Sequence, residues 1–258
     1  MGYIRDTVFI LRSEPFRESD TRLSMYGREY GKHVAIARGS RKLSAKHLGH
    51  LEPLTKVEVM IAEGIAFDKL AVARLYPPEG PMRDRLGVMT IGGMFVALVD
   101  QMTRPGVRDP SVFDLIEDVL NTLARLEHVP TRERARLLYA GASFRLLYCL
   151  GSGPELKTCM RCQNALEEPV YTHPSLGGFS CQTCSPALRQ EGIVGSRLPL
   201  HGLKLLRILA KCSTAELIPL AIEVGLIQKM SQLIDAFFSH TPLWNGEKTS
   251  DRVTVYFE

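Results

Sequence analysis

The sequence predicts an α+β protein of several domains: an N-terminal β-barrel, then an α-helical bundle that carries an inserted four-cysteine module. Three observations predict this fold class. Short β-branched and aromatic runs alternate with turn residues up to about residue 76. Helical periodicity begins after the breaker Pro-Pro-Glu-Gly-Pro at 77–81. Two Cys-x-x-Cys pairs then interrupt the helical segments. The expected domains are a barrel at 1–78, a bundle at 82–153 and 199–244, an insert at 154–198 and a tail at 245–258.

Five short strands are expected in the first 75 residues. Gly27 and Gly31 bracket a hairpin loop between the second and third strands. Short strands joined by turns predict a small closed barrel, and an OB-fold fits the strand count. Hydrophobic periodicity does not separate an OB-fold from an SH3-like barrel. The expected strands are 7–11, 21–26, 32–37, 56–59 and 67–75.

Three helices are expected between the proline-rich breaker and the insert, at 83–103, 109–127 and 131–150. Prolines stand at the expected starts of the second and third helices, and Gly151 is expected to cap the third. Apolar residues with helical spacing return at 203–209 and 217–238. We expect the helices on both sides of the insert to pack into one bundle.

Composition and length exclude several classes of protein. Of the 258 residues, 45% are hydrophobic and 23% are charged, so we expect a buried core and not a disordered or fibrous chain. The N-terminus lacks the apolar run of a signal peptide. The most apolar stretch, 86–99, is shorter than the roughly 20 residues that span a bilayer. We therefore expect a cytoplasmic protein, in a reducing compartment where paired cysteines hold metals or act in redox chemistry.

The spacing of four cysteines predicts a zinc site. Cys159 and Cys162 form one pair, Cys181 and Cys184 form the other, and 18 residues lie between the pairs. This spacing is typical of four thiolates that hold one Zn²⁺ in a tetrahedron. Because four thiolates fill the coordination shell, the ion should be structural. Redox dithiols are the alternative, but they more often occur as a single pair beside a βαβ unit. His173 lies between the pairs and is expected at the surface, not as a ligand.

Positive charge is concentrated in the predicted barrel. The chain has 32 basic and 28 acidic residues, a net charge of +4. Between residues 22 and 46 there are seven basic residues and one acid, Glu29, so this segment carries +6 and the rest carries −2. Such clustering is the electrostatic footprint of a polyanion partner, with a solvated charged surface as the alternative. The seven basic residues are Arg22, Arg28, Lys32, Arg38, Arg41, Lys42 and Lys46.

Motifs of common enzymes are absent from the sequence. It contains no phosphate-binding P-loop, no dinucleotide-binding glycine motif, no HExxH and no GxSxG. The carboxylate pairs at 117–118 and 167–168 are adjacent, so their side chains diverge and do not suit a two-metal nuclease. We therefore expect no catalytic residues and no enzymatic activity, with an unrecognised hydrolase as the alternative.

Two segments of the barrel, together with the order of domains, point to a known family. The sequence GKHVAIARGSRK at 31–42 leads from a strand into an Arg-Gly-small-Arg turn, and LEPL at 51–54 precedes the next strand. Over essentially the whole chain this pattern resembles the RecO family of bacterial recombinational-repair proteins. The family often has Ala where this chain has Ser40, and its zinc cysteines occur in only part of the family.

The resemblance implies a non-enzymatic, nucleoid-associated DNA-binding protein. Members of the family bind single- and double-stranded DNA and anneal complementary strands. With the partner RecR they help load RecA recombinase onto DNA coated by single-stranded-DNA-binding protein (SSB). The implied partners are therefore DNA, RecR and SSB, and no membrane.

The residues themselves also favour a nucleic-acid interface on the barrel. A basic strand and loop can follow a phosphate backbone while aromatic rings stack on bases. Tyr26 and Tyr30 are candidates for stacking, with ordinary barrel packing as the alternative. A zinc-containing protein–protein adaptor without a direct role on DNA is the alternative function. The expected phosphate contacts are Lys32, Arg38, Arg41, Lys42 and Lys46, with Arg28 and Arg74 second in rank.

Overall fold

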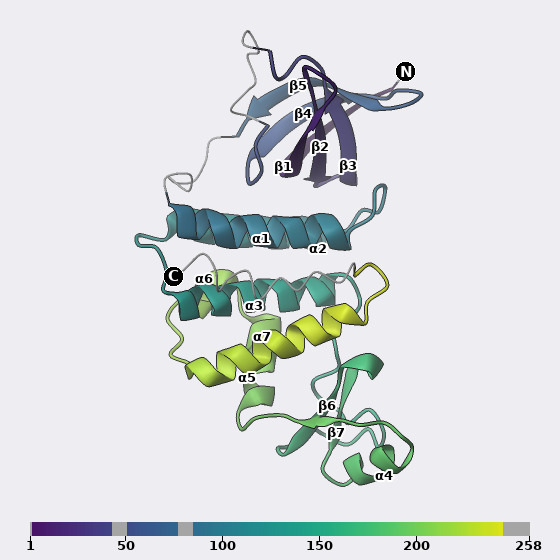
Figure 1. Ribbon diagram of the computed structural model, residues 1–258, viewed down its shortest axis with the longest axis vertical. Coiled ribbons are helices and arrows are strands. Elements are labelled where there is room, and N and C mark those ends of the chain that lie inside the picture. Colours follow the sequence, from purple (N-terminus) through teal and green to yellow (C-terminus); the bar gives the residue numbers. More distant parts are fainter. Residues whose placement is uncertain (1, 43–50, 77–84, 245–258) are drawn as a thin grey trace. The chain divides into compact units, whose positions relative to one another are not determined.

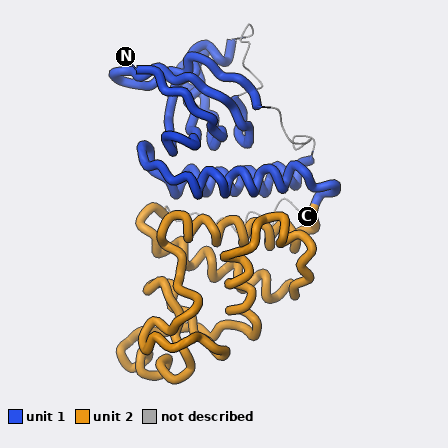
Figure 2. The backbone as a smooth tube through the Cα atoms, turned by 180° about the vertical axis from the view of Figure 1, so that it is seen from behind, with its two compact units in different colours: residues 1–129 blue, residues 130–258 orange. Residues whose placement is uncertain are grey.

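The computed structural model describes residues 2–42, 51–76 and 85–244. The chain divides into two compact units, residues 1–129 and residues 130–258, which are coloured separately in Figure 2. Unit 1 contains a β-barrel and two helices, and unit 2 contains the later helices and the cysteine module (Figure 1). The tail at 245–258 and the predicted phosphate contact Lys46 lie outside the described residues.

Five strands of unit 1 form a closed barrel, which confirms the predicted OB-fold. Around the barrel the strand order is β1-β2-β3-β5-β4, and β1 pairs with β4 to close it. Strands β3 and β5 pair in parallel, with Ile36 opposite Lys69. This Greek-key order, with its one parallel pair, distinguishes the barrel from the SH3-like alternative. The strands are β1 (Tyr3–Phe16), β2 (Asp20–Gly27), β3 (Gly31–Ala37), β4 (Lys56–Ala62) and β5 (Asp68–Leu75).

Strand β1 closes the barrel because it is long enough to pair on both sides. Residues 3–9 pair with β4, and residues 8–16 pair with β2. The register shifts between Ile10 and Arg12, and a bulge of this kind bends a strand. Alternate side chains point inward, as the period of a strand requires. The barrel core consists of Val8, Ile10, Leu23, Met25, Ala35, Ala37, Leu51, Val57, Val59, Ile61 and Ala73.

Two helices of the described ranges, α1 (Leu86–Met102) and α2 (Pro110–Arg125), follow the barrel in unit 1. Asp109 caps α2, because its carboxylate accepts a hydrogen bond from Ser111 N at 2.9 Å. Helix α1 packs against β1 and β2. The boundary between the compact units therefore differs from the expected domain boundary at 78–82, because the first two helices group with the barrel and not with the later helices.

The most apolar segment of the sequence forms α1, a largely buried helix. Val88, Ile91, Phe95 and Val99 are all buried on it. Among the helices of the described ranges, none combines the length and hydropathy that crossing a membrane requires. Asp100 is the buried acid of this helix.

The helices that flank the insert pack together in unit 2. Helix α3 (Arg132–Cys149) packs against α5 (Gly202–Lys211), α6 (Thr214–Leu217) and α7 (Val224–Ser239). The expected apolar segment 217–238 is divided between α6 and α7, and Pro219, which has no N–H to donate, lies in the break.

The insert between α3 and α5 is a small sheet with one short α-helix and one 3₁₀ turn, η1 (Pro174–Leu176). Strands β6 (Val170–His173), β7 (Gly178–Cys181) and β8 (Ser196–Arg197) form an antiparallel sheet in the order β7-β6-β8. Helix α4 (Ser185–Gln190) follows β7. Phe179 is fully buried, and its ring centroid lies 5.8 Å from that of Phe237 on α7. The insert is therefore anchored to the helices of unit 2 by aromatic packing.

Candidate metal centre and nucleic-acid interface

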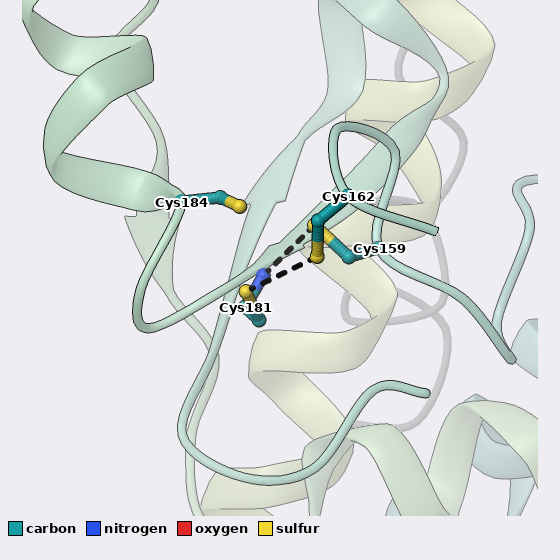
Figure 3. A group of neighbouring side chains, drawn as sticks. All are labelled: Cys159, Cys162, Cys181 and Cys184. Atoms are coloured by element: carbon teal, nitrogen blue, oxygen red, sulfur yellow. Dashed lines mark hydrogen bonds between the residues drawn. The ribbon is translucent and has the colours of Figure 1, made fainter. Parts of the chain in front are cut away.

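Two turns bring the four predicted ligands together in unit 2 (Figure 3). Cys159 and Cys162 lie in a turn before β6, Cys181 ends β7, and Cys184 directly precedes α4. Cys184 N donates to Cys181 O at 3.2 Å, which closes the second turn. The four sulfur atoms lie within 4.8 Å of one another. The predicted cysteine cluster is thus formed, and it could hold a metal ion.

The separation of two of the sulfur atoms fits a tetrahedral site. Sγ of Cys162 and Sγ of Cys181 are 3.9 Å apart. Metal–sulfur bonds of about 2.3 Å in a tetrahedron separate the sulfurs by about 3.8 Å. The buried Cys159 Sγ also accepts hydrogen bonds from the backbone N–H groups of Arg161 at 3.5 Å and Cys181 at 3.4 Å. Four thiolates would leave no coordination position for a substrate.

The pKa values of the thiols show why this cluster suits a cation. Burial opposes ionisation of Cys159, but hydrogen bonds from the backbones of Cys162, Cys181 and Arg161 outweigh it and lower its pKa to about 6. Desolvation, with hydrogen bonds to the neighbouring sulfurs, raises the pKa of Cys184 to about 12. The Cys159 thiolate therefore forms readily, and its negative charge disfavours ionisation of the neighbouring thiols. A bound dication supplies the charge that allows all four to ionise.

Two arginines brace the loops that carry the cysteines. Arg207, on α5, donates from Nη2 to Leu156 O at 2.8 Å and to Leu166 O at 3.3 Å, on either side of the first pair. Arg161 lies within the first pair, and its Nη1 is 2.6 Å from Oε1 of Glu191, the residue that follows α4. These contacts fix the first cysteine turn to α5 and to the segment after the second pair.

His173 is not part of the cysteine cluster, and it does not lie at the surface. The residue is 1% exposed, and its Nε2 is 2.9 Å from Ser180 Oγ. Burial lowers the pKa of His173, which favours the neutral ring. The expectation of a surface position is wrong because β6 pairs with β7 on one side and Gly195 packs against the imidazole on the other.

The turn after β3 presents three of the predicted phosphate contacts together. Arg38, Arg41 and Lys42 are all exposed there. None of the three side chains forms an ion pair with another residue of the described ranges. We name these residues the β3-turn cations.

Hydrogen bonds to the start of β2 build this turn. Gly39 has a positive φ of +62°, a conformation that glycine adopts readily, and its N–H donates to Oδ1 of Asp20 at 2.8 Å. Ser40 is buried, and its hydroxyl forms hydrogen bonds with Thr21 Oγ1 at 2.7 Å and with Ala37 O at 2.9 Å. The turn therefore holds its cations on a rigid backbone.

Lys32 is not available to DNA in this structure, contrary to the prediction. Its Nζ lies 2.9 Å from Oδ1 of Asp100 on α1, and it also donates to Thr103 O at 3.2 Å. Arg12 pairs with the other oxygen of Asp100 at 2.8 Å. Lys32 therefore joins the barrel to α1. Asp100 neutralises its charge within unit 1.

Tyr26 is also wrong as a DNA contact. It is 1% exposed, and its hydroxyl donates to Asp109 O at 3.1 Å, so its ring belongs to the packing of unit 1. Tyr30 is 45% exposed in the hairpin between β2 and β3. Its ring meets the ring of His33 edge-on, with centroids 5.8 Å apart.

The second-rank contacts Arg28 and Arg74 lie away from the β3-turn cations. Arg28 precedes β3, whereas the cations follow it. Nη2 of Arg28 is 3.2 Å from carboxylate oxygens of both Asp114 and Glu117 on α2. Three arginines and three acids line a cavity of about 560 Å³ here, so it has no excess of positive charge. These residues are Arg5, Arg28, Arg74, Asp6, Glu29 and Glu58.

A second group of residues, not predicted from the sequence, lies next to Arg38. Phe16 at the end of β1 and Arg17 in the β1–β2 loop line a cavity of about 340 Å³, together with Phe67 in the β4–β5 loop, Lys69 at the start of β5, and Arg38. The β1–β2 and β4–β5 loops of OB-folds bind oligonucleotides. The predicted strand 67–75 includes Phe67, whereas the turn residues Ala62-Glu63-Gly64 just before it also suit an exposed loop aromatic.

An OB-fold barrel followed by helices with a four-cysteine insert defines a class of multidomain OB-fold proteins with a cysteine module that could hold a metal ion. Comparison with known proteins specifies the family. Residues 1–77 match the family model described as Recombination protein O N terminal, and residues 83–242 match Recombination protein O C terminal. The chain therefore belongs to the RecO family, as the sequence resemblance indicated.

Curated relatives agree with this assignment. The chain is 31% identical over 189 residues to the DNA repair protein RecO of Cutibacterium acnes. The aligned region covers 72% of this chain and 76% of the relative. It is 29% identical over 184 residues to that of Pelotomaculum thermopropionicum, covering 71% and 69%. For that of Bifidobacterium longum the identity is 29% over 186 residues, covering 70% and 74%.

Proposed function

We propose that this chain is a DNA-binding mediator of recombinational repair that breaks and forms no covalent bonds. In this proposal it binds single- and double-stranded DNA, anneals complementary strands and, with RecR, helps load RecA onto SSB-coated DNA in association with the bacterial nucleoid. Its relatives are named DNA repair proteins, which supports the repair role. The β3-turn cations are the single observation that carries DNA binding.

The β3-turn cations can bind DNA by neutralising phosphates and releasing counterions. Arg38, Arg41 and Lys42 are held on one hydrogen-bonded turn, so their charges act on one short stretch of a strand. A cationic surface also lowers the repulsion between two phosphate chains and raises their local concentration. Annealing then follows from base pairing between the strands and needs no catalytic group.

We propose that the metal of the cysteine cluster is one structural Zn²⁺ ion. Zinc prefers four thiolates in a tetrahedron, and the sulfur separation fits this geometry. Besides Cys159, the insert buries six apolar side chains over 45 residues, so metal binding would supply part of its folding free energy. They are Leu156, Leu166, Val170, Phe179, Leu188 and Leu198.

A salt titration of DNA binding tests the proposed function. Replacing Arg38, Arg41 and Lys42 together by Ala should lower the affinity for a single-stranded oligonucleotide. It should also flatten the slope of log K against log salt by about 2, or about 0.7 for each lost phosphate contact. Replacing the exposed Arg189, Lys204 and Lys229 of unit 2 by Ala removes the same charge elsewhere and is the matched control.

The two triple variants separate local contacts from net charge. The proposal is supported if the barrel variant changes the DNA affinity and the salt slope strongly and the unit 2 variant changes them little. An unchanged slope in a folded barrel variant removes these residues from the interface. Weak, salt-insensitive binding by the wild type favours the protein–protein adaptor instead. Annealing of SSB-coated complementary strands, measured with both variants, then tests whether DNA binding serves the repair activity.

A further inference from the structure

The β4–β5 loop exposes aromatic and apolar side chains beside Arg38, one of the β3-turn cations. Phe67 is 51% exposed, and Ile65 in the same loop is fully exposed. The rings of Phe16 and Phe67 meet edge-on, with centroids 5.7 Å apart and planes at 65°. Large exposed apolar side chains that gather at one place mark a binding surface.

Positive charge surrounds these rings. The guanidinium of Arg17 lies over the Phe16 ring, with Cζ 5.2 Å from its centroid, and Arg38 and Lys69 line the same cavity. The cavity also contains the acids Asp20 and Glu63. Asp20 is engaged by Gly39 N, so its carboxylate is already partly compensated. Three cations against two acids leave a small positive excess next to an aromatic surface.

The backbone of the β4–β5 loop is built to hold Phe67 in place. Gly64 N donates to Oδ1 of Asp68 at 3.1 Å, which closes the loop. A Cβ on Gly64 would lie 2.1 Å from Phe67 O, so only glycine fits between the two sides of the loop. Phe67 therefore projects from a constrained turn at the edge of the cavity.

A nucleobase of a single strand matches this chemistry. A base has two apolar faces that stack on aromatic rings, and a phosphate on each side that cations can bind. The cavity of about 340 Å³ falls in the range of small-ligand sites, roughly 300–1,000 Å³. In a duplex both faces of each base are covered by its neighbours, so a duplex cannot use this surface without losing base stacking.

We propose that Phe67, braced by Phe16, is a stacking site for one unstacked base, and that Arg17, Arg38 and Lys69 bind the phosphates beside it. This inference rests on the proposed function and adds strand selectivity to it. The barrel binds single-stranded DNA more tightly than duplex DNA because only the single strand offers a free base face. The β3-turn cations act on phosphates of either form.

Substitution of Phe67 tests this site with three DNA ligands: a thymidine oligonucleotide, an abasic oligonucleotide of the same length and the corresponding duplex. Phe67→Ala should weaken binding of the thymidine strand by about fivefold to a hundredfold, and should leave abasic and duplex binding nearly unchanged. Phe67→Trp should restore the affinity. Tyr76→Ala, which removes another exposed barrel aromatic, is the matched control. Thermal unfolding verifies that each variant is folded.

Fluorescence supplies a direct readout of stacking. Trp244 is the only tryptophan of the chain, so Phe67→Trp in a Trp244→Phe background places one reporter at the site. The proposal expects this reporter to be quenched by the thymidine strand and not by the abasic strand. Equal quenching by both strands, or none by either, contradicts stacking.

The outcomes distinguish this site from the proposed function. If the double variant Arg41→Ala, Lys42→Ala weakens DNA binding while Phe67→Ala leaves the affinity for all three DNA ligands unchanged, the stacking site is wrong and the DNA-binding function stands. If neither variant weakens binding, the proposed function fails as well. If Tyr30→Ala, and not Phe67→Ala, selectively weakens the thymidine strand, the base stacks in the β2–β3 hairpin and the inference is overturned.

Discussion

Lys32 Nζ lies 2.9 Å from Oδ1 of Asp100, and each of these two side chains is only 10% exposed. The pair joins β3 to α1 within unit 1. Ser24 also donates to Asp100, and Arg12 holds its second oxygen at 2.8 Å. Desolvation raises the pKa of Asp100, but the hydrogen bonds and charges of Ser24, Lys32 and Arg12 outweigh it, so its pKa lies below the ordinary value of 3.8.

Asp100→Asn should lower the free energy of unfolding at neutral pH by about 3 kcal/mol, because it leaves Lys32 buried without its counter-charge. Since the folded pKa is lower than the unfolded one, the carboxylate stabilises the fold above pH 3.8, and this stabilisation disappears as the pH falls below that value. Urea denaturation near neutral pH and near pH 3 measures both effects, and the difference between variant and wild type should narrow in acid.

Asp114→Asn is the control for this prediction. Asp114 pairs with Arg28 on the surface, and its side chain is 61% exposed. An exposed pair contributes less than about 1 kcal/mol, so this variant should unfold nearly as the wild type does. Equal destabilisation by the two substitutions would show that burial of the Lys32–Asp100 pair does not determine the loss of unfolding free energy.

Removal of Cys159 and Cys162 should empty the metal site. We expect about one metal ion per chain in the wild type and none in the variant with both residues changed to Ser, because two thiolates cannot complete the tetrahedron. Elemental analysis measures the metal, and hydrogen exchange should show faster exchange at 154–198. Cys149 and Cys212 lie outside the cluster, so the variants Cys149→Ser and Cys212→Ser should bind metal as the wild type does. Full metal content in the double variant contradicts the assignment.

Arg207→Met should weaken metal binding without touching a ligand. The substitution leaves the carbonyls of Leu156 and Leu166 without their donor, and these residues flank the first cysteine pair. Outer-sphere contacts of this kind change metal affinity by roughly tenfold or more. Competition with a chelator measures the affinity. The exposed Arg197 supplies the control Arg197→Met, and an affinity loss equal in the two variants would assign the effect to charge.

Local sequence patterns predicted the features that depend on neighbouring residues. The strand runs gave the barrel, and the spacing of Cys159, Cys162, Cys181 and Cys184 gave the cysteine cluster, because each pair is closed by its own turn. The position of the β3-turn cations followed from the strand that ends at Ala37. In each case the physical cause lies within a few residues of the pattern.

Features that depend on distant partners could not be predicted in this way. Lys32 is basic in the sequence, but Asp100, which neutralises it, is 68 residues away and meets it only because α1 packs on the barrel. A contact between distant segments also underlies the site of Phe16 and Phe67, because the end of β1 and the β4–β5 loop meet only when the barrel closes. The grouping of α1 and α2 with the barrel also depends on tertiary packing, which the hydrophobic periodicity of a single segment does not reveal.

Two adjacent glycines of α1 allow a last prediction, on helix packing. A Cβ on Gly93 would meet no atom within 4 Å, whereas a Cβ on Gly92 would lie 3.2 Å from Leu54 Cδ2 and 3.3 Å from Leu120 Cδ2. Both substitutions by Ala gain helix propensity, which contributes up to about 1 kcal/mol. Gly93→Ala should therefore raise the unfolding free energy by nearly that amount. Gly92→Ala should gain less, because the two leucines must shift in a close-packed core. Urea denaturation of the two variants measures the difference, and a larger gain for Gly92→Ala would contradict the packing of α1 described above.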